Sequence, residues 1–243
     1  MQRIDKNVER VLEALKTILT SDPFDNYNAE TLENALADDG CDCQVAYGAT
    51  KACIIPRNSN LVIKIPFNRN IDTDLYYSEQ SEFEDRGEEM PYSVDEYAHE
   101  LECATCKALD DEDYHWDYCR LETLIYEAAV NAGVSRFFAQ ECYYGEINDH
   151  PIYLQDRATP IWDITERSNE ESKRRSEIFC KEHNIFCFDE AWIADFIAYY
   201  GEEEFLKLSN FINEYDIDDL RRDNIGYIGF CPVLFDYSGF REW

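Results

Sequence analysis

Three polar side chains near the end of the chain have the types and the spacing of a small reactive centre. Asp219 is followed by Asn224 and then by Asp236. A carboxylate can orient or deprotonate a hydroxyl group, while an amide oxygen and a second carboxylate are hard ligands that suit a divalent cation. The apolar runs Ile225 to Ile228 and Val233 to Phe235 predict two short strands. A hairpin of this kind would bring the three side chains to one point.

This arrangement resembles the catalytic loop and the metal-binding D-F-G turn of the protein-kinase-like phosphotransferases. The resemblance implies that Asp219 orients or deprotonates the acceptor hydroxyl. It also implies that Asn224 and Asp236 bind the Mg²⁺ that bridges the phosphates of ATP. Asp218 is an alternative base, and Asp219 is preferred because Leu220 follows it. An accidental acidic loop is the alternative to the motif in a chain with 52 Asp and Glu.

A lysine in an apolar strand fits the same resemblance. Lys64 lies in the run Leu61 to Phe67 and is similar to the strand lysine that pairs with nucleotide phosphates and with a helix glutamate. Burying an unpaired ammonium group is costly, so this lysine needs an anionic partner. Glu122 resembles that partner, and Glu127 is the alternative. Taken alone, Lys64 could also be an edge-strand lysine that reaches water, and either glutamate could lie on a solvated helix face.

Two further segments occupy positions where this family contacts the nucleotide. Gly48 and Lys51 lie where a phosphate-covering loop is expected, and Lys51 would add positive charge there. With a single glycine, a plain hairpin turn is the alternative. Gln155 and Arg157 lie where a strand would enter the hinge, whose backbone groups would hold the adenine edge. Side-chain identity carries little information at such positions.

The chain also departs from the family pattern. Ile217 and Asp218 replace the H-R of H-R-D, so control by phosphorylation of an activation segment is not expected. Ser238 replaces the glycine of D-F-G. The sequence printed ends at Trp243, with nothing that corresponds to the activation segment or to the later helices. The resemblance therefore covers roughly 40–240, and the chain looks closer to compact, divergent phage or bacterial kinase-like proteins than to eukaryotic enzymes.

A second group of residues has the composition of a zinc site. Cys103 and Cys106 are followed by His115 and Cys119, an approximate Cys3His spacing for a structural Zn²⁺. The alternative is two helical cysteines, an exposed histidine and a buried small hydrophobic residue. Both alternatives stay open at this point.

The elements that must position these residues follow from hydrophobic periodicity and from breakers. Helices are predicted over 4–19, 29–37, 118–132, 170–183, 189–197 and 202–215, and strands over 44–47, 52–56, 61–67, 136–144, 152–155, 225–228 and 233–235. Turns are predicted at 147–150 and 229–232. This order predicts an α+β fold with a kinase-like, antiparallel-sheet N-lobe and a small, mostly helical C-lobe that ends just after the D-F-G-like turn. The expected parts are a helical segment 1–39, an N-lobe 40–157 with an acidic insert 68–117, and a C-lobe 158–243.

Composition limits the partners that the chain can have. A net charge of −30 disfavours direct binding to nucleic acid or to anionic membranes and favours a basic protein partner. Without a signal peptide or a membrane-spanning apolar run, a cytoplasmic location is expected, with the ten cysteines reduced.

The sequence therefore predicts an ATP- and Mg²⁺-dependent, kinase-like phosphotransferase that acts on a hydroxyl acceptor. The alternative is a pseudokinase, an acidic protein-binding or inhibitory module with the same fold. A third hypothesis, which the chain supports less, is an acidic mimic of nucleic acid.

Overall fold

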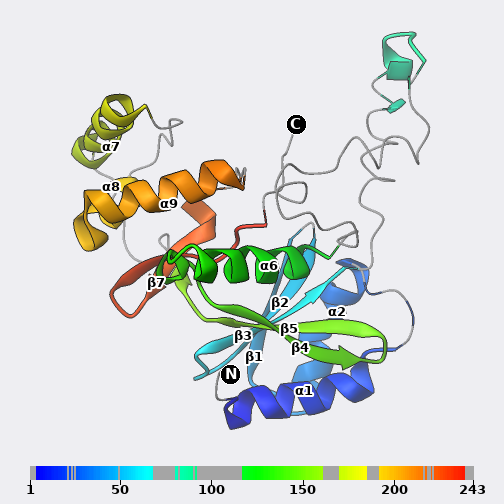
Figure 1. Cartoon of the computed structure of the whole chain (residues 1–243). Helices are drawn as coiled ribbons and strands as arrows, with labels where there is room; N and C mark the ends of the chain where they lie inside the picture. The colour runs from blue at the N-terminus through cyan, green and yellow to red at the C-terminus, as the bar shows by residue number, and fades with distance from the viewer. Residues whose placement is uncertain are drawn as a thin grey trace.

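The computed structural model describes residues 4–20, 22, 24, 26–48, 50–67, 80–81, 83–89, 91, 117–160, 170–184, 192–215, 217, 220 and 222–238. The helices are α1 (Lys6–Ile18), α2 (Asn26–Asp38), α6 (Tyr118–Asn131), α7 (Glu170–His183), α8 (Trp192–Tyr200) and α9 (Glu202–Glu214), with short 3₁₀ turns η1 (Ser135–Phe137) and η3 (Arg222–Asn224). The strands are β1 (Cys43–Tyr47), β2 (Lys51–Pro56), β3 (Leu61–Pro66), β4 (Glu141–Ile147), β5 (His150–Asp156), β6 (Thr159–Pro160), β7 (Ile225–Ile228) and β8 (Cys231–Leu234). The predicted α+β class is confirmed (Figure 1).

A five-stranded antiparallel sheet forms the centre of one half of the molecule. Its strand order is β1-β2-β3-β5-β4, which leaves β1 and β4 at the edges. The register places Cys53 opposite Lys64 and Val62 opposite Gln155. Since successive side chains of a strand point to opposite faces, this register decides which residues share a face.

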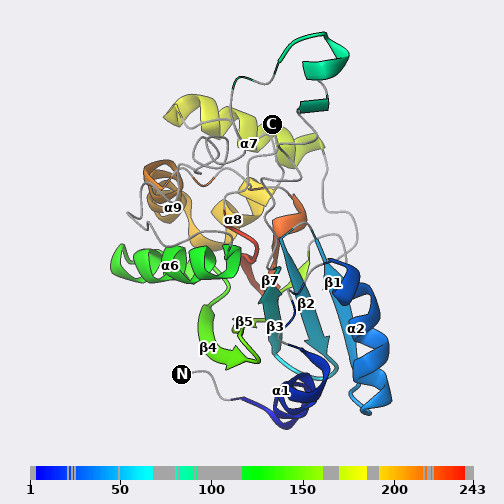
Figure 2. The ribbon, with the colours of Figure 1, turned by 90° about the vertical axis from the view of Figure 1, so that its right-hand side faces the viewer.

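The two faces of this sheet are covered by different helices. Helices α1 and α2 pack on one face, where Ile54, Ile63 and Ile65 are fully buried. The capping of α1 by Asp5, whose side chain accepts from the backbone N–H of Val8, starts the helix that supplies the apolar stripe. Helix α6 lies on the opposite side, so that the sheet separates it from α2 (Figure 2).

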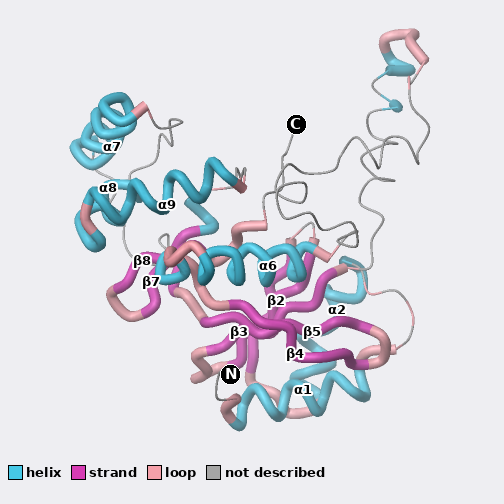
Figure 3. Tube along the Cα trace, viewed as in Figure 1, coloured by secondary structure: helices cyan, strands magenta, loops and turns pink. Residues whose placement is uncertain are grey.

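A second, three-stranded sheet with the order β6-β7-β8 lies beside α8 and α9 (Figure 3). A Cβ at Gly226 would come within 2.5 Å of the Thr159 carbonyl oxygen, closer than real contacts allow. Glycine at this position therefore lets β6 pair directly with β7. This pairing ties the segment that leaves β5 to the terminal hairpin.

The helical half has its own hydrophobic core, in which α6 takes part with α7, α8, α9 and the terminal hairpin. Trp192, Phe196 and Phe205 are buried there and meet at ring-centroid distances of 5.1 to 6.3 Å. Helix α6 thus contacts both the sheet and the helical core. A residue on its inner side can therefore join the two halves.

The predicted strand 136–144 was wrong at both ends. The chain forms η1 and then β4, which begins at Glu141 and runs to Ile147. The reason is that Phe137 and Phe138 are adjacent and both buried in the helical core, whereas a strand with one buried face would bury alternate residues. The hairpin turn is Asn148 and Asp149, both with positive φ, as a two-residue turn between twisted strands requires.

The first strand of the terminal hairpin, β7, has the predicted bounds, and the second strand begins and ends earlier than expected. Strand β8 starts at Cys231, so the turn is Gly229 and Phe230 alone, with Gly229 at φ 64°.

Helix α6 ends at Asn131, and Gly133 at φ 74° closes it, close to the predicted end. Along edge strand β4 the register shifts between Tyr143 and Gly145, which is a β-bulge.

Several expectations fall on residues outside the described ranges. These are most of the acidic insert 68–117 and the expected start of a helix at 189. Within the described part of the chain, no helix has both the length and the apolar character needed to cross a bilayer. The cysteines found in these ranges are all free thiols.

Candidate functional site

Two lysines lie side by side on the face of the large sheet that faces α6. Lys64 is opposite Cys53 in the β2–β3 register, and Lys51 lies two residues before Cys53 on the same strand. The alternation of side chains along β2 therefore puts both ammonium groups on one face. Both lysines are buried, with 5% and 3% of Lys51 and Lys64 exposed.

Glu122 of α6 contacts both lysines. Its side chain is fully buried; Oε1 accepts from Lys51 Nζ and Oε2 accepts from Lys64 Nζ. Of the two glutamates considered on this helix, Glu122 therefore makes the contact, and Glu127 is exposed. Because each carboxylate oxygen takes a different lysine, one side chain joins α6 to both β2 and β3.

The turn after β8 supplies the next carboxylate. Asp236 Oδ1 accepts from Lys51 Nζ at 2.8 Å, and the Phe235 carbonyl oxygen accepts from Lys64 Nζ at 3.3 Å. The Asp236 side chain keeps 35% of its surface exposed, unlike the buried lysines. The backbone N–H of Phe235 donates to the carbonyl oxygen of Asn224 at 2.9 Å, which joins the residue before Asp236 to the last residue of η3.

A third carboxyl group completes the cluster. Glu141, the first residue of β4, has no exposed side-chain surface, and its Oε2 lies 2.8 Å from Lys64 Nζ. The same oxygen accepts from Gln155 Nε2 at 2.9 Å. We call Lys51, Lys64, Glu122, Glu141 and Asp236 the ion-pair cluster.

Burial and charge move the pKa values of the cluster in opposite directions. Burial opposes the charge of Lys51, but Asp236 and Glu122 outweigh it and hold the lysine pKa well above its ordinary value. The pKa of Glu122 is lowered, since the two lysines outweigh its burial. Burial and the nearby Glu122 charge raise the pKa of Glu141 well above its ordinary value. Burial also raises the pKa of Asp236.

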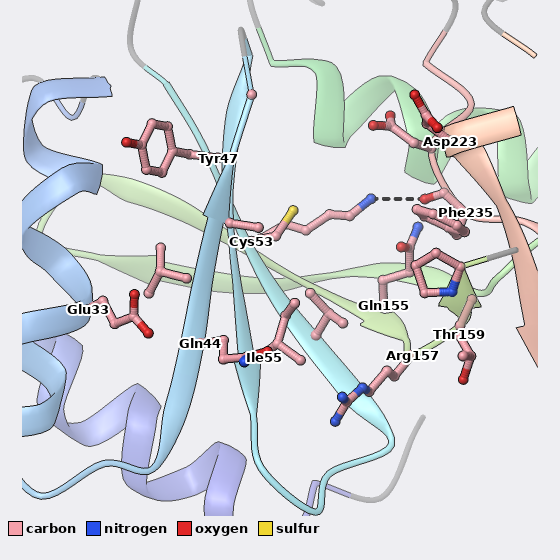
Figure 4. A pocket seen from close by; sticks show the side chains of 18 residues that line it. Glu33, Gln44, Tyr47, Cys53, Ile55, Gln155, Arg157, Thr159, Asp223 and Phe235 are labelled. Atoms are coloured by element: carbon pink, nitrogen blue, oxygen red, sulfur yellow. Dashed lines mark hydrogen bonds between the residues drawn. The ribbon is translucent and has the colours of Figure 1, made fainter. Parts of the chain in front are cut away.

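The cluster opens on one side into a pocket of about 990 Å³. Figure 4 shows Gln155, Phe235 and Asp223 around a lysine side chain that donates to the Phe235 carbonyl. The pocket lies between the β1–β2 hairpin, the segment that leaves β5, and the turn after β8. Its size falls at the upper end of the range for small-molecule sites. Lys64 is among the lining residues and Lys51 is not.

Most of the predicted nucleotide contacts lie around this pocket. Gly48, Lys64, Gln155 and Arg157 all line it. The Gln155 side chain that lines the pocket also donates a hydrogen bond to Glu141. The backbone N–H of Arg157 donates to Asn60 O at 2.7 Å, which holds the start of the connection to β6.

Lys51 lies elsewhere than expected. It is the first residue of β2 rather than part of a turn over the pocket, and it is buried against Glu122 and Asp236. The backbone N–H of Gly48 donates to the Lys51 carbonyl at 3.1 Å, so the hairpin closes in front of the lysine. Its ammonium group therefore belongs to the ion-pair cluster.

Some predicted site residues lie outside the described ranges: the expected base Asp219 and three expected zinc ligands, Cys103, Cys106 and His115. The fourth expected zinc ligand, Cys119, is described and is fully buried on α6. Among the residues with described positions, no group of three or more His, Cys, Asp or Glu is arranged to hold a metal ion.

Two residues of the site escaped the sequence analysis. Asp223 lines the pocket, next to the predicted ligand Asn224 in the chain. Glu141 was expected in mid-strand, without a role. The signal for Glu141 was an acidic residue between Ala139 and Cys142, but only the register of β4 with β5 brings it to Lys64.

Comparison with protein-family models, with curated proteins and with solved structures found no match. The geometry of the pocket and of the ion-pair cluster is therefore the basis for any functional assignment.

Proposed function

We propose that the protein is an ATP- and Mg²⁺-dependent phosphotransferase of kinase-like architecture that acts on a hydroxyl acceptor. One observation carries the proposal: Lys64 and Asp236, from distant segments, line one pocket, and Glu122 from a third segment pairs with Lys64. In protein-kinase-like phosphotransferases, a lysine held by a helix glutamate and a nearby turn carboxylate position the nucleoside triphosphate.

The order of the elements supports the same proposal. A sheet with one crossing helix, a short connection from β5 to β6, and a helical half with a terminal hairpin correspond to an N-lobe, a hinge and an abbreviated C-lobe. In this proposal the connection at Arg157 and Ala158, which lines the pocket, would face the base of the nucleotide.

The charges around the pocket suit a phosphate ligand only together with a cation. Lys64 and Arg157 are opposed there by Glu33, Asp223 and Asp236. A polyphosphate entering alone would meet more carboxylates than ammonium and guanidinium groups, which costs free energy. Mg²⁺ held with the nucleotide by these carboxylates would lower that cost by neutralising part of the phosphate charge.

The donor set fits Mg²⁺. Asp236 presents a partly exposed carboxylate to the pocket, Asp223 presents a second, and Asn224 follows in the chain, all hard oxygen ligands. When bound, Mg²⁺ would withdraw charge from the transferred phosphoryl group. Lys64 would steady the phosphates, Glu122 would hold Lys64, and Asp219 would orient the acceptor hydroxyl or accept its proton. Catalysis would then rest on positioning rather than on a covalent intermediate.

The first test is thermal unfolding of the protein with ATP, with and without Mg²⁺. A ligand that binds only the folded state stabilises it by about 2.7 kcal/mol at one hundred times its Kd. We expect a Mg²⁺-dependent rise in Tm that Asp236→Ala abolishes, whereas the exposed Glu127→Ala retains it. No rise at millimolar nucleotide would refute the proposal. Phosphoryl transfer that Asp219→Asn leaves intact would refute the role of Asp219.

One observation favours the second candidate, a pseudokinase that serves as an acidic protein-binding module. The Lys64 ammonium already has three protein acceptors, Glu122, Glu141 and the Phe235 carbonyl. Lys64 is thus paired without any ligand. A basic protein partner would suit the net charge of −30, either as substrate or as binding partner. Labelled phosphate transfer separates the candidates, since only the enzyme turns over.

A further inference from the structure

The ion-pair cluster holds more carboxyl groups than lysines. Lys51 and Lys64 face Glu122, Glu141 and Asp236, and four of these five side chains are at most 6% exposed. An excess charge inside a protein is costly, so a buried group of this kind tends to be neutralised by a proton. One carboxyl group therefore differs in role from the other two.

Glu141 is the group that differs. Glu122 uses both oxygens on lysines, and Asp236 is paired with Lys51 and partly exposed to the pocket. Glu141 is fully buried, uses only Oε2 for Lys64 and Gln155, and leaves Oε1 without a hydrogen-bond partner. Burial and the charge of Glu122 both raise its pKa. A protonated carboxyl group at this place would remove the excess charge without losing the contact to Lys64.

The position of Glu141 also limits where Lys64 can go. Glu122 reaches the ammonium from α6, and Glu141 reaches it from β4. Gln155 of β5, opposite Glu141 in the register, donates to the same Oε2 and so fixes the carboxyl group. With Glu141 in place, Lys64 stays on the sheet beside the pocket. Without it, the long lysine side chain would be held by Glu122 and by one carbonyl oxygen.

We propose that Glu141, as a neutral carboxyl group, is a positioning residue that fixes Lys64 at the pocket from β4, in addition to the contact that Glu122 makes from α6. The significance of that position for nucleotide binding rests on the proposed function. The contact between Glu141 and Lys64 does not. If Glu141 only filled space, the oxygen that contacts Lys64 would not matter. Substitutions that keep or remove this oxygen therefore test the inference.

The test compares Glu141→Gln with Glu141→Ala. Glutamine keeps an oxygen for Lys64 and carries no charge, so it resembles the protonated acid, whereas alanine removes the contact. Leu36→Ala, buried in the core between α1, α2 and the sheet, is the matched control for lost stability. All variants are measured at a temperature where circular dichroism shows them folded.

The first readout is acylation of Lys64 by acetic anhydride, followed by mass spectrometry. Buried and paired amines react slowly, because acylation requires a free, neutral amine. We expect Glu141→Ala to raise the rate several-fold, and Glu141→Gln and Leu36→Ala to stay close to the wild type. Equal rates in the alanine variant and the wild type would overturn the inference, as would a glutamine variant as reactive as the alanine variant.

The second readout is the affinity for a fluorescent ATP analogue with Mg²⁺. We expect Glu141→Ala to weaken binding about tenfold, Glu141→Gln to restore most of it, and Glu141→Ala to add little in a Lys64→Met background, because residues acting through one contact are not additive. Independent, additive losses would overturn the inference. If the wild type binds no analogue while the acylation pattern holds, the proposed function fails and the positioning role stands.

Discussion

The two faces of the five-stranded sheet are made by the same strands and differ completely in chemistry. On the face toward α1 and α2, Ile54, Ile63 and Ile65 are fully buried among apolar side chains. The face toward α6 carries Lys64, which lies between Ile63 and Ile65 on β3, and Gln155 of β5, which donates to Glu141. One face supplies stability through burial, and the other collects charges that only tertiary contacts can neutralise. A shift of one residue in register would exchange the two.

Breaking the charged face at its centre should have the largest effect. Glu122→Ala leaves Lys51 and Lys64 without the carboxylate that both contact, and removing one partner of a buried ion pair costs about 3–5 kcal/mol. Urea unfolding should show this loss. Glu127→Ala, on the exposed side of the same helix, should change stability by less than about 0.5 kcal/mol. Similar losses in both variants would mean that Glu122 is not the shared partner of the lysines.

A substitution on the apolar face should lower the free energy of unfolding by a comparable or smaller amount and leave the binding pocket unchanged. Ile63→Ala removes buried methyl groups and should lower the free energy of unfolding by about 2–5 kcal/mol. Below its melting temperature the variant should bind the fluorescent ATP analogue as the wild type does. Affinity that falls in step with stability would show that the two faces are not separate in function.

The smallest effect should appear in the pH dependence of stability. Glu141 has a folded pKa raised above its ordinary 4.5, so the folded state keeps a proton that the unfolded state loses. The stability that this group contributes is therefore present below pH 4.5 and is lost as the pH rises from 4.5 toward the folded pKa. Glu141→Gln should flatten this decline in urea unfolding series at fixed salt. The Glu122 pKa is lowered, which gives stability the opposite slope below about pH 4 and serves as an internal comparison.

Sequence patterns predicted the parts of the site that depend on local order. Lys64 could be recognised because a lysine within an apolar strand needs a partner, and the α6 helix was placed closely because Gly133 ends it. Glu122 followed from the family resemblance and lies in contact with that lysine. The kinase-like function itself stays a prediction.

The parts that were missed depend on pairing between distant segments. Lys51 was expected in a turn, because the sequence does not reveal where the β1–β2 hairpin closes. Glu141 was not recognised, because two consecutive buried phenylalanines before it obscured the start of β4. Its contact with Lys64 arises only from the strand order β3-β5-β4, which no local pattern contains.

The segment before β4 is hydrogen-bonded to the terminal hairpin. The backbone N–H of Ala139 donates to Leu234 O at 2.7 Å, and the buried Tyr237 hydroxyl donates to the Ala139 carbonyl at 2.9 Å. Proteolytic removal of the chain after 230 would therefore delete Asp236 and also release the backbone that leads into Glu141. Supplied separately as a peptide, the missing strand β8 and the turn after it would have to restore both at once. The chain is thus a candidate for fragment complementation, with the recovery of one carboxylate coupled to the placement of the other.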